Sequence, residues 1–393
     1  MAPAPDPIRV SEGLRDLIMS GSAVAFVGAG FSRPAGMPNW EELLRALLNR
    51  SKRFQKNDQD IANCEQCINE GDFAIAASYL RRLLPQVEID QVTHRLFGAA
   101  RLDQLEEGTR ARMIERMQNL VEAPWAGIVT TNYDTLIERG FELQEMRRAV
   151  IAHDHNTQLG TALYRSAEED IFFVKIHGSL PHTRIVLSSE EYDQVYIASP
   201  KIHNFLYAVM LSYSLIFIGA SIESEILAIR RRLCVDFAGN VPSAYALLPA
   251  STKNRRREAW LSDLARIDTI FYEDGDHGAV DNFLTQCALI GKTKRREQSQ
   301  LPAQAAKIRR LAVERKLQEI GSVNQAIYVH LRERCGGALS KRQLMGLEDG
   351  PAWPKPLSRL SDNELYYRLL FLVSIGLVAE HGGNNETIFT ALE

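Results

Sequence analysis

Short, nearly continuous apolar runs separated by longer amphipathic segments form the main pattern along the chain. Runs such as AVAFV, FFVKI and LIFI lack polar alternation, which is typical of parallel strands that helices cover on both faces. Six such strands are expected, at residues 23–27, 127–130, 172–176, 215–218, 245–248 and 269–272. Helical patterns fill the intervals between them. The expected fold class is therefore α/β, with a doubly wound parallel, Rossmann-like sheet.

Two regions depart from this alternation. From about residue 41 to residue 121 the chain is polar, charged and helical in pattern, and we expect a helical insertion that could form a lid. A basic, polar, proline-containing stretch at 292–304 is expected to be a linker. These boundaries predict a sheet domain over 8–291 and a separate C-terminal module over 305–393.

Composition limits the class of protein without naming a function. The chain has 393 residues, of which 45% are apolar and 24% charged, as in folded proteins of two or three domains. Its net charge of -3 gives no global attraction for nucleic acid or an acidic membrane. Five scattered cysteines favour reduced thiols and a cytoplasmic location. Neither export nor membrane insertion is expected, because no basic, apolar leader and no spanning run is found.

Four polar motifs follow the first four expected strands, where open α/β sheets bind their ligands. In the first motif, GAGFSRPAGMP, Gly28 and Gly30 allow a tight turn and a close approach of backbone. The helix start that follows can offer free N–H groups to a phosphate. A plain strand-to-helix turn is the alternative. The missing third glycine of G-x-G-x-x-G argues against an ordinary dehydrogenase.

The other three motifs each have a functional and a structural interpretation. Asn132 and Asp134 follow the second strand and could grip ribose hydroxyls, or they could form an Asx turn and a helix cap. His177, in a His-Gly turn after the third strand, could be a base near neutral pH or a plain turn residue. The turn at 219–221 after the fourth strand allows close approach and supplies a hydroxyl, or is merely a turn.

In combination and in this order, the four motifs resemble the sirtuin family: GAG-x-S-x-x-x-G-x-P, Asn-x-Asp, His-Gly and a Gly-small-Ser turn. The resemblance covers roughly residues 8–291. It implies an NAD site in which the first motif holds the dinucleotide phosphates and the last lies along the adenosine half. The residues assigned to these two parts are Gly28, Ala29, Gly30 and Ser32, and Gly219, Ala220 and Ser221.

The resemblance also implies roles at the nicotinamide end of the site. Asn132 would position the nicotinamide ribose and a water, and His177 would contact the ribose hydroxyls and act as general base. Asp134 would support the nicotinamide pocket, and Phe31 would lie in a flexible loop over the nicotinamide. The stretch 273–277 would close over the adenine.

Two enzyme classes share such a site, because cleavage of the nicotinamide–ribose bond builds an oxocarbenium-like cation that either an acyl-lysine or water can capture. Deacylase sirtuins usually carry a zinc ribbon with two C-x-x-C pairs after the Asn-x-Asp motif. Here the only C-x-x-C, Cys64 to Cys67, precedes Asn132 and is interpreted as two helical cysteines one turn apart. The triplet at 153–155, His-Asp-His, is interpreted as a solvated loop. No metal is expected.

The absent ribbon and the helical insertion resemble bacterial sirtuin-like NAD hydrolases of antiphage defence, which deplete cellular NAD. The expected function is therefore an NAD+ hydrolase (NADase) that uses NAD as substrate and releases nicotinamide and ADP-ribose. An NAD-dependent protein deacylase and a non-enzymatic nucleotide-sensing or nucleic-acid-binding regulator are the alternatives. The sequence does not distinguish hydrolysis to ADP-ribose from cyclisation of the same intermediate. Such an enzyme must be silent at rest, and the insertion is the expected gate.

The tail resembles a winged helix, with Ser361 and Glu364 in capping-box spacing and a hairpin of strands at 377–380 and 387–392. From residue 292 onward there are 16 Lys and Arg against 11 Asp and Glu, whereas the whole chain has 46 against 49. Nucleic acid is one expected partner of this module, and assembly into a homo-oligomer is favoured because the helix is mostly apolar. A separate sensor, such as a DNA-translocating ATPase or a short Argonaute, is also expected.

Overall fold

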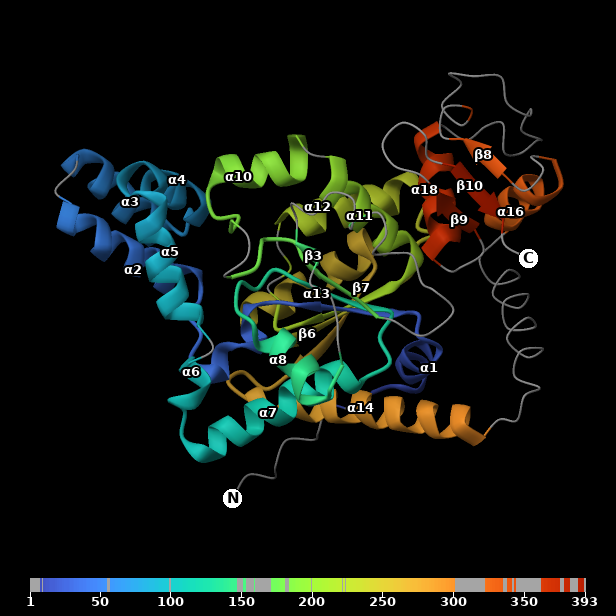
Figure 1. Ribbon diagram of the computed structural model, residues 1–393, viewed down its shortest axis with the longest axis horizontal. Helices are drawn as coiled ribbons and strands as arrows, with labels where there is room; N and C mark the ends of the chain where they lie inside the picture. The colour runs from blue at the N-terminus through green and yellow to red at the C-terminus, as the bar shows by residue number, and fades with distance from the viewer. Residues whose placement is uncertain are drawn as a thin grey trace.

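A seven-stranded parallel sheet lies at the centre of the structure, a computed structural model (Figure 1). The strands run in the order β3-β4-β2-β1-β5-β6-β7, so the direction of winding reverses between β1 and β5. This is the topological switch point at which doubly wound folds bind ligands. The structure describes residues 8, 10–54, 57–98, 100–146, 151–152, 159, 171–180, 184–198, 200–220, 222, 224–300, 322–334, 338–340, 343, 362–374, 378–381 and 388–391.

All six expected strands are present, which confirms the α/β class. A seventh, β3 (Ile151–Ala152), was not expected, because two residues carry no periodicity; it is a strand through its pairing with β4. The other strands are β1 (Ala23–Val27), β2 (Gly127–Thr130), β4 (Phe172–Lys175), β5 (Ser214–Ile218), β6 (Ala244–Pro249) and β7 (Ile267–Tyr272).

The two faces of the sheet build two hydrophobic cores, as the unbroken apolar runs require. Along β1, Val24 and Phe26 face one core, whereas Ala23, Ala25 and Val27 face the other. The first core is covered by α11 (Pro200–Ser212), α12 (Ser224–Asp236) and α13 (Thr252–Ala265). The second is covered by α1 (Glu12–Ser20), α7 (Glu107–Glu122), α8 (Leu136–Leu143) and α14 (His277–Gln300).

Within its described residues, the segment between β1 and β2 contains helices and turns but no strand, as expected of the insertion. Its outer part projects from the sheet (Figure 1) and meets α10 (Ser189–Asp193) through an ion pair of 3.1 Å between Arg81 and Glu191. Before α7, its elements are η1 (Ala29–Phe31), η2 (Arg33–Ala35), α2 (Trp40–Ser51), η3 (Lys52–Phe54), α3 (Asp58–Glu70), α4 (Phe73–Leu83), α5 (Gln86–Phe97) and α6 (Ala100–Asp103).

The expected start of the linker at residue 292 is wrong, because α14 continues to Gln300. Lys, Arg, Glu and Gln are good helix formers, so the charged stretch extends the helix. Lys292 and Arg295 on this extension both pair with Glu122 of α7, at 3.2 and 2.9 Å. Residues 301–304 lie outside the described residues.

In the part of the C-terminal module that the structure describes, the elements are two helices and a small antiparallel sheet of order β8-β10-β9. The expected hairpin is present as β9 and β10, and the winged-helix assignment stays a prediction; the expected cap Ser361 lies outside the described residues. Tyr367 of α18 donates a hydrogen bond of 2.6 Å to Asn204 of α11, so this module packs on the sheet domain. The elements are α16 (Ser322–Arg334), β8 (Ala338–Ser340), α18 (Asp362–Ser374), β9 (Val378–His381) and β10 (Ile388–Ala391).

No helix in the described part of the chain has both the length and the apolar character needed to cross a bilayer.

Candidate functional site

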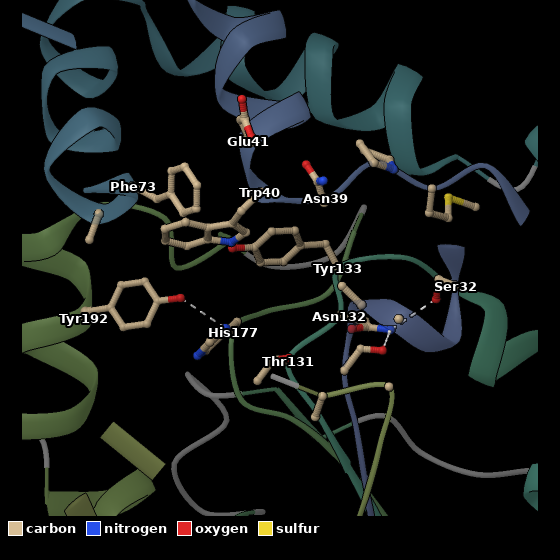
Figure 2. A pocket seen from close by; sticks show the side chains of 18 of the residues that line it. Ser32, Asn39, Trp40, Glu41, Phe73, Thr131, Asn132, Tyr133, His177 and Tyr192 are labelled. Atoms are coloured by element: carbon tan, nitrogen blue, oxygen red, sulfur yellow. Dashed lines mark hydrogen bonds between the residues drawn. The ribbon is translucent and has the colours of Figure 1, made fainter. Parts of the chain in front are cut away.

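A cavity of about 930 Å³ lies at the carboxyl ends of β1, β2, β4 and β5, beneath the insertion (Figure 2). Its size is within the range of small-molecule sites. Loops that are up to about 190 residues apart in the sequence meet here, because parallel strands end at one edge of the sheet. The expected site residues that line it are Gly28, Ala29, Gly30, Ser32, Asn132, Asp134, His177, Gly219 and Ala220.

The glycines of the first and fourth motifs are required by contact between their two loops. The amide of Gly30 donates to the carbonyl of Gly219 at 2.8 Å. A Cβ on Gly28 would lie 2.5 Å from the Cα of Ala220, and one on Gly30 would lie 2.8 Å from the oxygen of Gly219. Gly219 itself has a φ of 62°, in the left-handed region that favours glycine. The close approach expected from the sequence is therefore an approach of loop to loop.

The amides that follow Gly30 differ from the expected phosphate cradle. After β1 the chain forms the two 3₁₀ turns η1 and η2 before the first long helix begins at Trp40. The amide of Phe31 donates to the carbonyl of Gly28, and the amide of Ser32 donates to the carbonyl of Ala29, each at 3.0 Å. These amides are thus used inside the loop, and two tight turns take the place of the expected helix start with free N–H groups.

Asn132 lies at the centre of the cavity floor, where its amide joins two loops. Its Nδ2 donates to the carbonyl of Gly28 at 3.2 Å and to the hydroxyl of Ser32 at 3.1 Å. Its Oδ1 is buried and accepts no hydrogen bond, although the residue is only 6% exposed. Because an unsatisfied buried acceptor is costly, this oxygen can accept a hydrogen bond from a hydroxyl group of a bound molecule or from a water.

His177 is held by two tyrosines that follow it in sequence. Its Nε2 lies 2.7 Å from the hydroxyl of Tyr196, and its Nδ1 lies 3.5 Å from the hydroxyl of Tyr192. Both rings meet the imidazole edge to face, at centroid distances of 5.9 and 5.0 Å. Which nitrogen carries the proton depends on these hydroxyls. The imidazole is therefore oriented within the cavity wall and coupled to two further groups that exchange protons.

Asp134 combines the two interpretations that its position allowed. It lines the cavity, and its Oδ1 also accepts the amide hydrogen of Leu136 at 3.0 Å, at the start of α8. An Asx turn of this kind fixes the carboxylate against the backbone. The structure thus shows the Asx turn, and Asp134 lines the cavity as well.

A buried lysine that the sequence did not single out supports the loop of Asn132 and Asp134. Lys175, the last residue of β4, is fully buried, and its Nζ donates to the carbonyls of Asp134 and, at 3.5 Å, Tyr133. It also pairs with Glu138 of α8 at 2.8 Å. Burial raises the pKa of Glu138, and the neighbouring Lys175 opposes that rise. This lysine ties the loop after β2 to the strand that carries His177.

Comparison with known proteins agrees with this geometry. Residues 126–270, from the start of β2 into β7, match the family model of the SIR2-like domain. Over these residues, called the SIR2-like domain below, the chain is similar to that family. The match confirms the sirtuin resemblance and contains Asn132, Asp134 and His177.

Three curated proteins are similar to the chain beyond this domain. An NAD(+) hydrolase ThsA of Bacillus cereus (strain MSX-D12) is 22% identical over 268 residues, which are 64% of this chain and 50% of that protein. An NAD(+) hydrolase ThsA of Acinetobacter baumannii (strain 532279) is 27% identical over 226 residues, 56% of this chain and 41% of that protein. An uncharacterized protein, y4cA, of Sinorhizobium fredii is 26% identical over 216 residues, 53% of this chain and 17% of that protein. The chain thus spans half or less of the length of these relatives.

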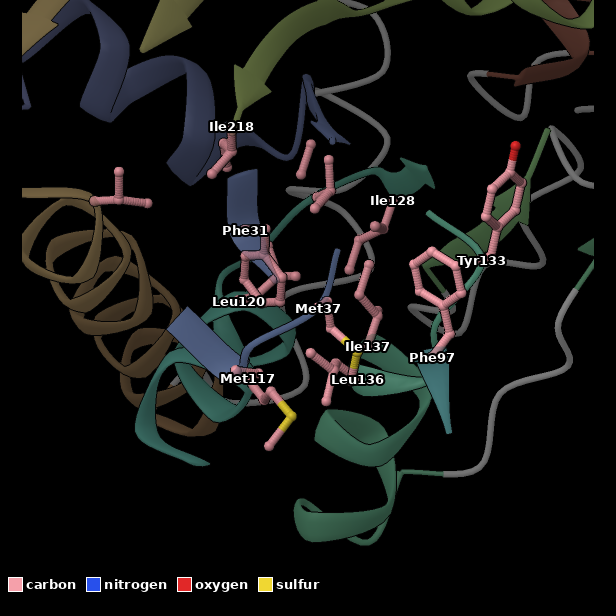
Figure 3. Packing of buried hydrophobic residues seen from close by; sticks show 14 of the residues in the cluster. Phe31, Met37, Phe97, Met117, Leu120, Ile128, Tyr133, Leu136, Ile137 and Ile218 are labelled. Atoms are coloured by element: carbon pink, nitrogen blue, oxygen red, sulfur yellow. The ribbon is translucent and has the colours of Figure 1, made fainter. Parts of the chain in front are cut away.

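Phe31 does not lie where the resemblance placed it. Its ring is fully buried in the core beneath the SIR2-like domain, with Met37, Met117 and Leu120 in the same cluster (Figure 3). Arg116 of α7 lies over this ring at 5.9 Å and donates to the carbonyl of Phe31 at 3.0 Å. An apolar residue after GAG is compatible with a core or with a flexible loop, and Phe31 belongs to the core.

The expected assignment of Ser221 stays a prediction, because this residue lies outside the described residues. The triplet at 153–155 lies outside them as well. The stretch 273–277 is described, but none of its residues lines the cavity of the SIR2-like domain. His277 begins α14, and its carbonyl accepts from Arg116 at 2.9 Å, which places it among the structural contacts of the second core.

The insertion supplies a wall of the cavity that the sequence did not predict. Trp40, at the start of α2, and Phe73, at the start of α4, line it together with Asn39, Glu41 and Asp72. The capping box at Asn39, whose side chain accepts from the amide of Glu42 at 2.8 Å, is a sequence signal for this helix start. Only the fold brings these residues over the SIR2-like domain.

The cavity of the SIR2-like domain is acidic. Four carboxylates line it, and none of its described lining residues is a lysine or an arginine. Such a wall favours a ligand that carries positive charge or develops it. The carboxylates are Glu41, Asp72, Asp134 and Asp193.

The cysteines of the C-x-x-C pair lie in the insertion, away from this cavity. Both belong to α3, as expected, and both are free thiols. Burial raises the pKa of Cys64 to about 12, so its thiol stays protonated at neutral pH. Within the described residues, no group of three or more potential metal ligands is found.

Proposed function

We propose that this protein is an NAD+ hydrolase that cleaves the bond between nicotinamide and ribose. The observation that carries the proposal is the buried, unsatisfied Oδ1 of Asn132, a residue that lines a large cavity together with His177. The SIR2-like domain and two similar proteins named as NAD(+) hydrolases support it. The wall offers hydrogen-bond acceptors and aromatic rings, groups that can contact the ribose and the ring systems of a dinucleotide.

In the proposed reaction the C1′–N bond breaks, and its electron pair leaves with nicotinamide. The ribose becomes oxocarbenium-like, because the positive charge moves to it from the nicotinamide ring. Asn132 accepts a hydrogen bond from the ribose or from the attacking water through its Oδ1. Water forms the new C1′–O bond and its proton passes to His177. Orientation of the two reactants can contribute up to ~7–11 kcal/mol in the best cases.

We infer water rather than an acyl-lysine as the acceptor. The only C-x-x-C pair precedes Asn132, so the zinc ribbon typical of deacylase sirtuins has no counterpart after it. Aromatic rings of the insertion and of α10 also stand over His177, where an acyl-lysine would have to enter.

A wider role is part of the same proposal. As the resemblance to defence sirtuins implies, the enzyme acts in antiphage defence and depletes NAD once it is activated. The insertion is the proposed gate, and a homo-oligomer or a separate sensor protein is the proposed means of control. The net positive C-terminal module is the proposed point of contact with a partner, which could be protein or nucleic acid.

The experiment is to incubate the purified protein with NAD, with and without an acetylated peptide, and to separate the products by chromatography. Peptide-independent release of nicotinamide and ADP-ribose is expected, at a basal rate that activation would raise. Asn132→Ala and His177→Ala should each abolish it, while Asn69→Ala and His94→Ala, at exposed positions of the insertion, should not. Turnover that requires the peptide and yields O-acetyl-ADP-ribose would overturn the proposal in favour of a deacylase.

A further inference from the structure

Three aromatic rings connect the insertion to the imidazole of His177. Trp40 meets Phe73 at a centroid distance of 5.9 Å and Tyr192 at 5.8 Å, both edge to face. Tyr192 in turn meets the imidazole of His177 at 5.0 Å. All four residues line the same cavity, and Figure 2 shows Trp40 and Phe73 above His177, with Tyr192 pointing toward it. The ring of Trp40 therefore bounds the space next to the proposed base.

The position of this ring is fixed from the side of α2. Asn39 caps the helix one residue before Trp40, and the carboxylate of Glu42 accepts a hydrogen bond of 2.8 Å from the backbone amide of Asn39. Arg33 holds the carboxylate of Glu42 through two nitrogens. This interaction lowers the pKa of Glu42, so the pair stays charged at neutral pH. Trp40 thus extends from a helix start that is tied to the loop after β1.

The opposite side of the wall is fixed through α10. Ser78 of α4 donates to Glu190 at 2.6 Å, and Arg81 of α4 pairs with Glu191 at 3.1 Å. These contacts hold the segment of Tyr192 against the helix that begins with Phe73. Both sides of the aromatic wall are therefore braced, and a molecule that enters beside His177 must fit the space that the rings leave.

We propose that Trp40 is a specificity-determining residue that limits the acceptor of the ADP-ribosyl group to water and very small alcohols. This inference rests on the proposed function. Removal of the indole ring opens space beside His177 for a larger primary alcohol. The C1′–N bond then breaks with its electron pair leaving on nicotinamide, the alcohol oxygen forms the C1′–O bond, and the alcohol proton passes to His177. The product is an alkyl ADP-ribose in place of ADP-ribose.

The test is a competition between water and alcohols within one reaction. NAD is incubated with the full-length protein and equal concentrations of methanol, 1-propanol or 2-phenylethanol, and alkyl ADP-ribose and ADP-ribose are quantified. The ratio of the two products does not depend on the amount of active enzyme. For the wild type the ratio should fall steeply from methanol to 2-phenylethanol. For Trp40→Ala the ratio for the larger alcohols, relative to methanol, should rise at least tenfold.

Matched variants separate a cavity effect from a general one. Trp260→Ala removes a tryptophan that is 39% exposed on α13 and should leave the ratios at their wild-type values. Trp40→Phe keeps a ring and should give an intermediate profile. If Trp40→Ala does not fold, Phe73→Ala opens the same wall and should raise the same ratio.

The outcomes distinguish the two proposals. Unchanged ratios in folded Trp40→Ala and Phe73→Ala, together with normal NAD cleavage, would overturn the specificity role and leave the hydrolase proposal intact. Failure of the wild type to cleave NAD in any of these mixtures would overturn the hydrolase proposal itself.

Discussion

Replacement of Lys175 by methionine should destabilise the protein and disable the site together. The side chain of Lys175 is completely buried and that of Glu138 is 17% exposed, so the pair is shielded from solvent. Methionine keeps a similar length and apolar stem but removes the charge and its donors. The substitution leaves Glu138 without its cation and the carbonyls of Tyr133 and Asp134 without this donor.

The magnitude can be worked out from these contacts. Removal of one partner from a buried ion pair costs about 3–5 kcal/mol, because the other charge stays desolvated. Glu138 lowers part of this cost by taking up a proton, since burial already raises its pKa. We therefore expect Lys175→Met to lower the free energy of unfolding by about 3 kcal/mol. Lys175→Met combined with Glu138→Leu should cost less than the sum of the single changes, by roughly 1–3 kcal/mol of coupling.

Urea unfolding at pH 7 measures these energies, and NAD turnover is measured on the fraction that stays folded. The control is Arg139→Ala, which breaks an ion pair with Glu142 on the same helix, where both side chains are more than half exposed. It should cost at most about 1 kcal/mol. A Lys175→Met variant that unfolds at the wild-type urea concentration and retains full activity would refute the argument that this lysine supports the loop of Asn132.

Three further outcomes are expected. Burial would raise the pKa of Glu191, but the amides of Ser188 and Leu187 and the Arg81 guanidinium outweigh burial and lower that pKa. The stabilisation from Glu191 is therefore present above the ordinary value of 4.5 and is lost as pH falls through the folded-state pKa. Glu191→Gln should lower the melting temperature at pH 7, and the difference from the wild type should vanish in acid. Tyr196→Phe removes the 2.7 Å contact to the imidazole and should reduce kcat about two- to tenfold with little change in KM; an unchanged kcat contradicts its positioning role. Glu41→Gln removes the charge of a carboxylate that lines the cavity and pairs with Arg45 at 2.8 Å; it should raise KM for NAD about two- to fivefold and leave kcat nearly unchanged. A large loss of kcat in steady-state assays contradicts this.

The sheet was predictable from sequence because its strands are buried on both faces. AVAFV and LIFI leave no polar residue to expose, so these runs fit only the interior of a parallel sheet. The two-residue β3 was not predictable, because it exists through its partner strand alone. The end of α14 was misplaced for a related reason: a charged stretch is typical of a linker, but its residues favour helix and find Glu122 as a partner.

The site was predictable only where the topology assigns residues to strand ends. Asn132 and His177 each follow a strand directly, so the parallel sheet brings them to one edge. Trp40 and Tyr192 do not follow a strand, so the topology does not predict their place. Their position over the cavity depends on how the insertion packs against α10. Lys175 could have been noticed as a charge inside an apolar strand, which requires a buried partner.

The acidity of the cavity does not by itself explain catalysis of NAD cleavage. The nicotinamide ring of NAD+ already carries a positive charge, and cleavage moves that charge to the ribose without changing its sign. A carboxylate that lines the cavity, such as that of Glu41, attracts the cationic ring of the substrate and the cationic ribose of the transition state almost equally, which lowers KM without raising kcat. Rate is gained only by a group fixed beside the ribose. Among the described residues that line the cavity, Asn132 best meets this condition, since two hydrogen bonds hold its amide and its free oxygen is buried. Catalysis should therefore depend on the neutral amide of Asn132 more than on the carboxylates that line the cavity.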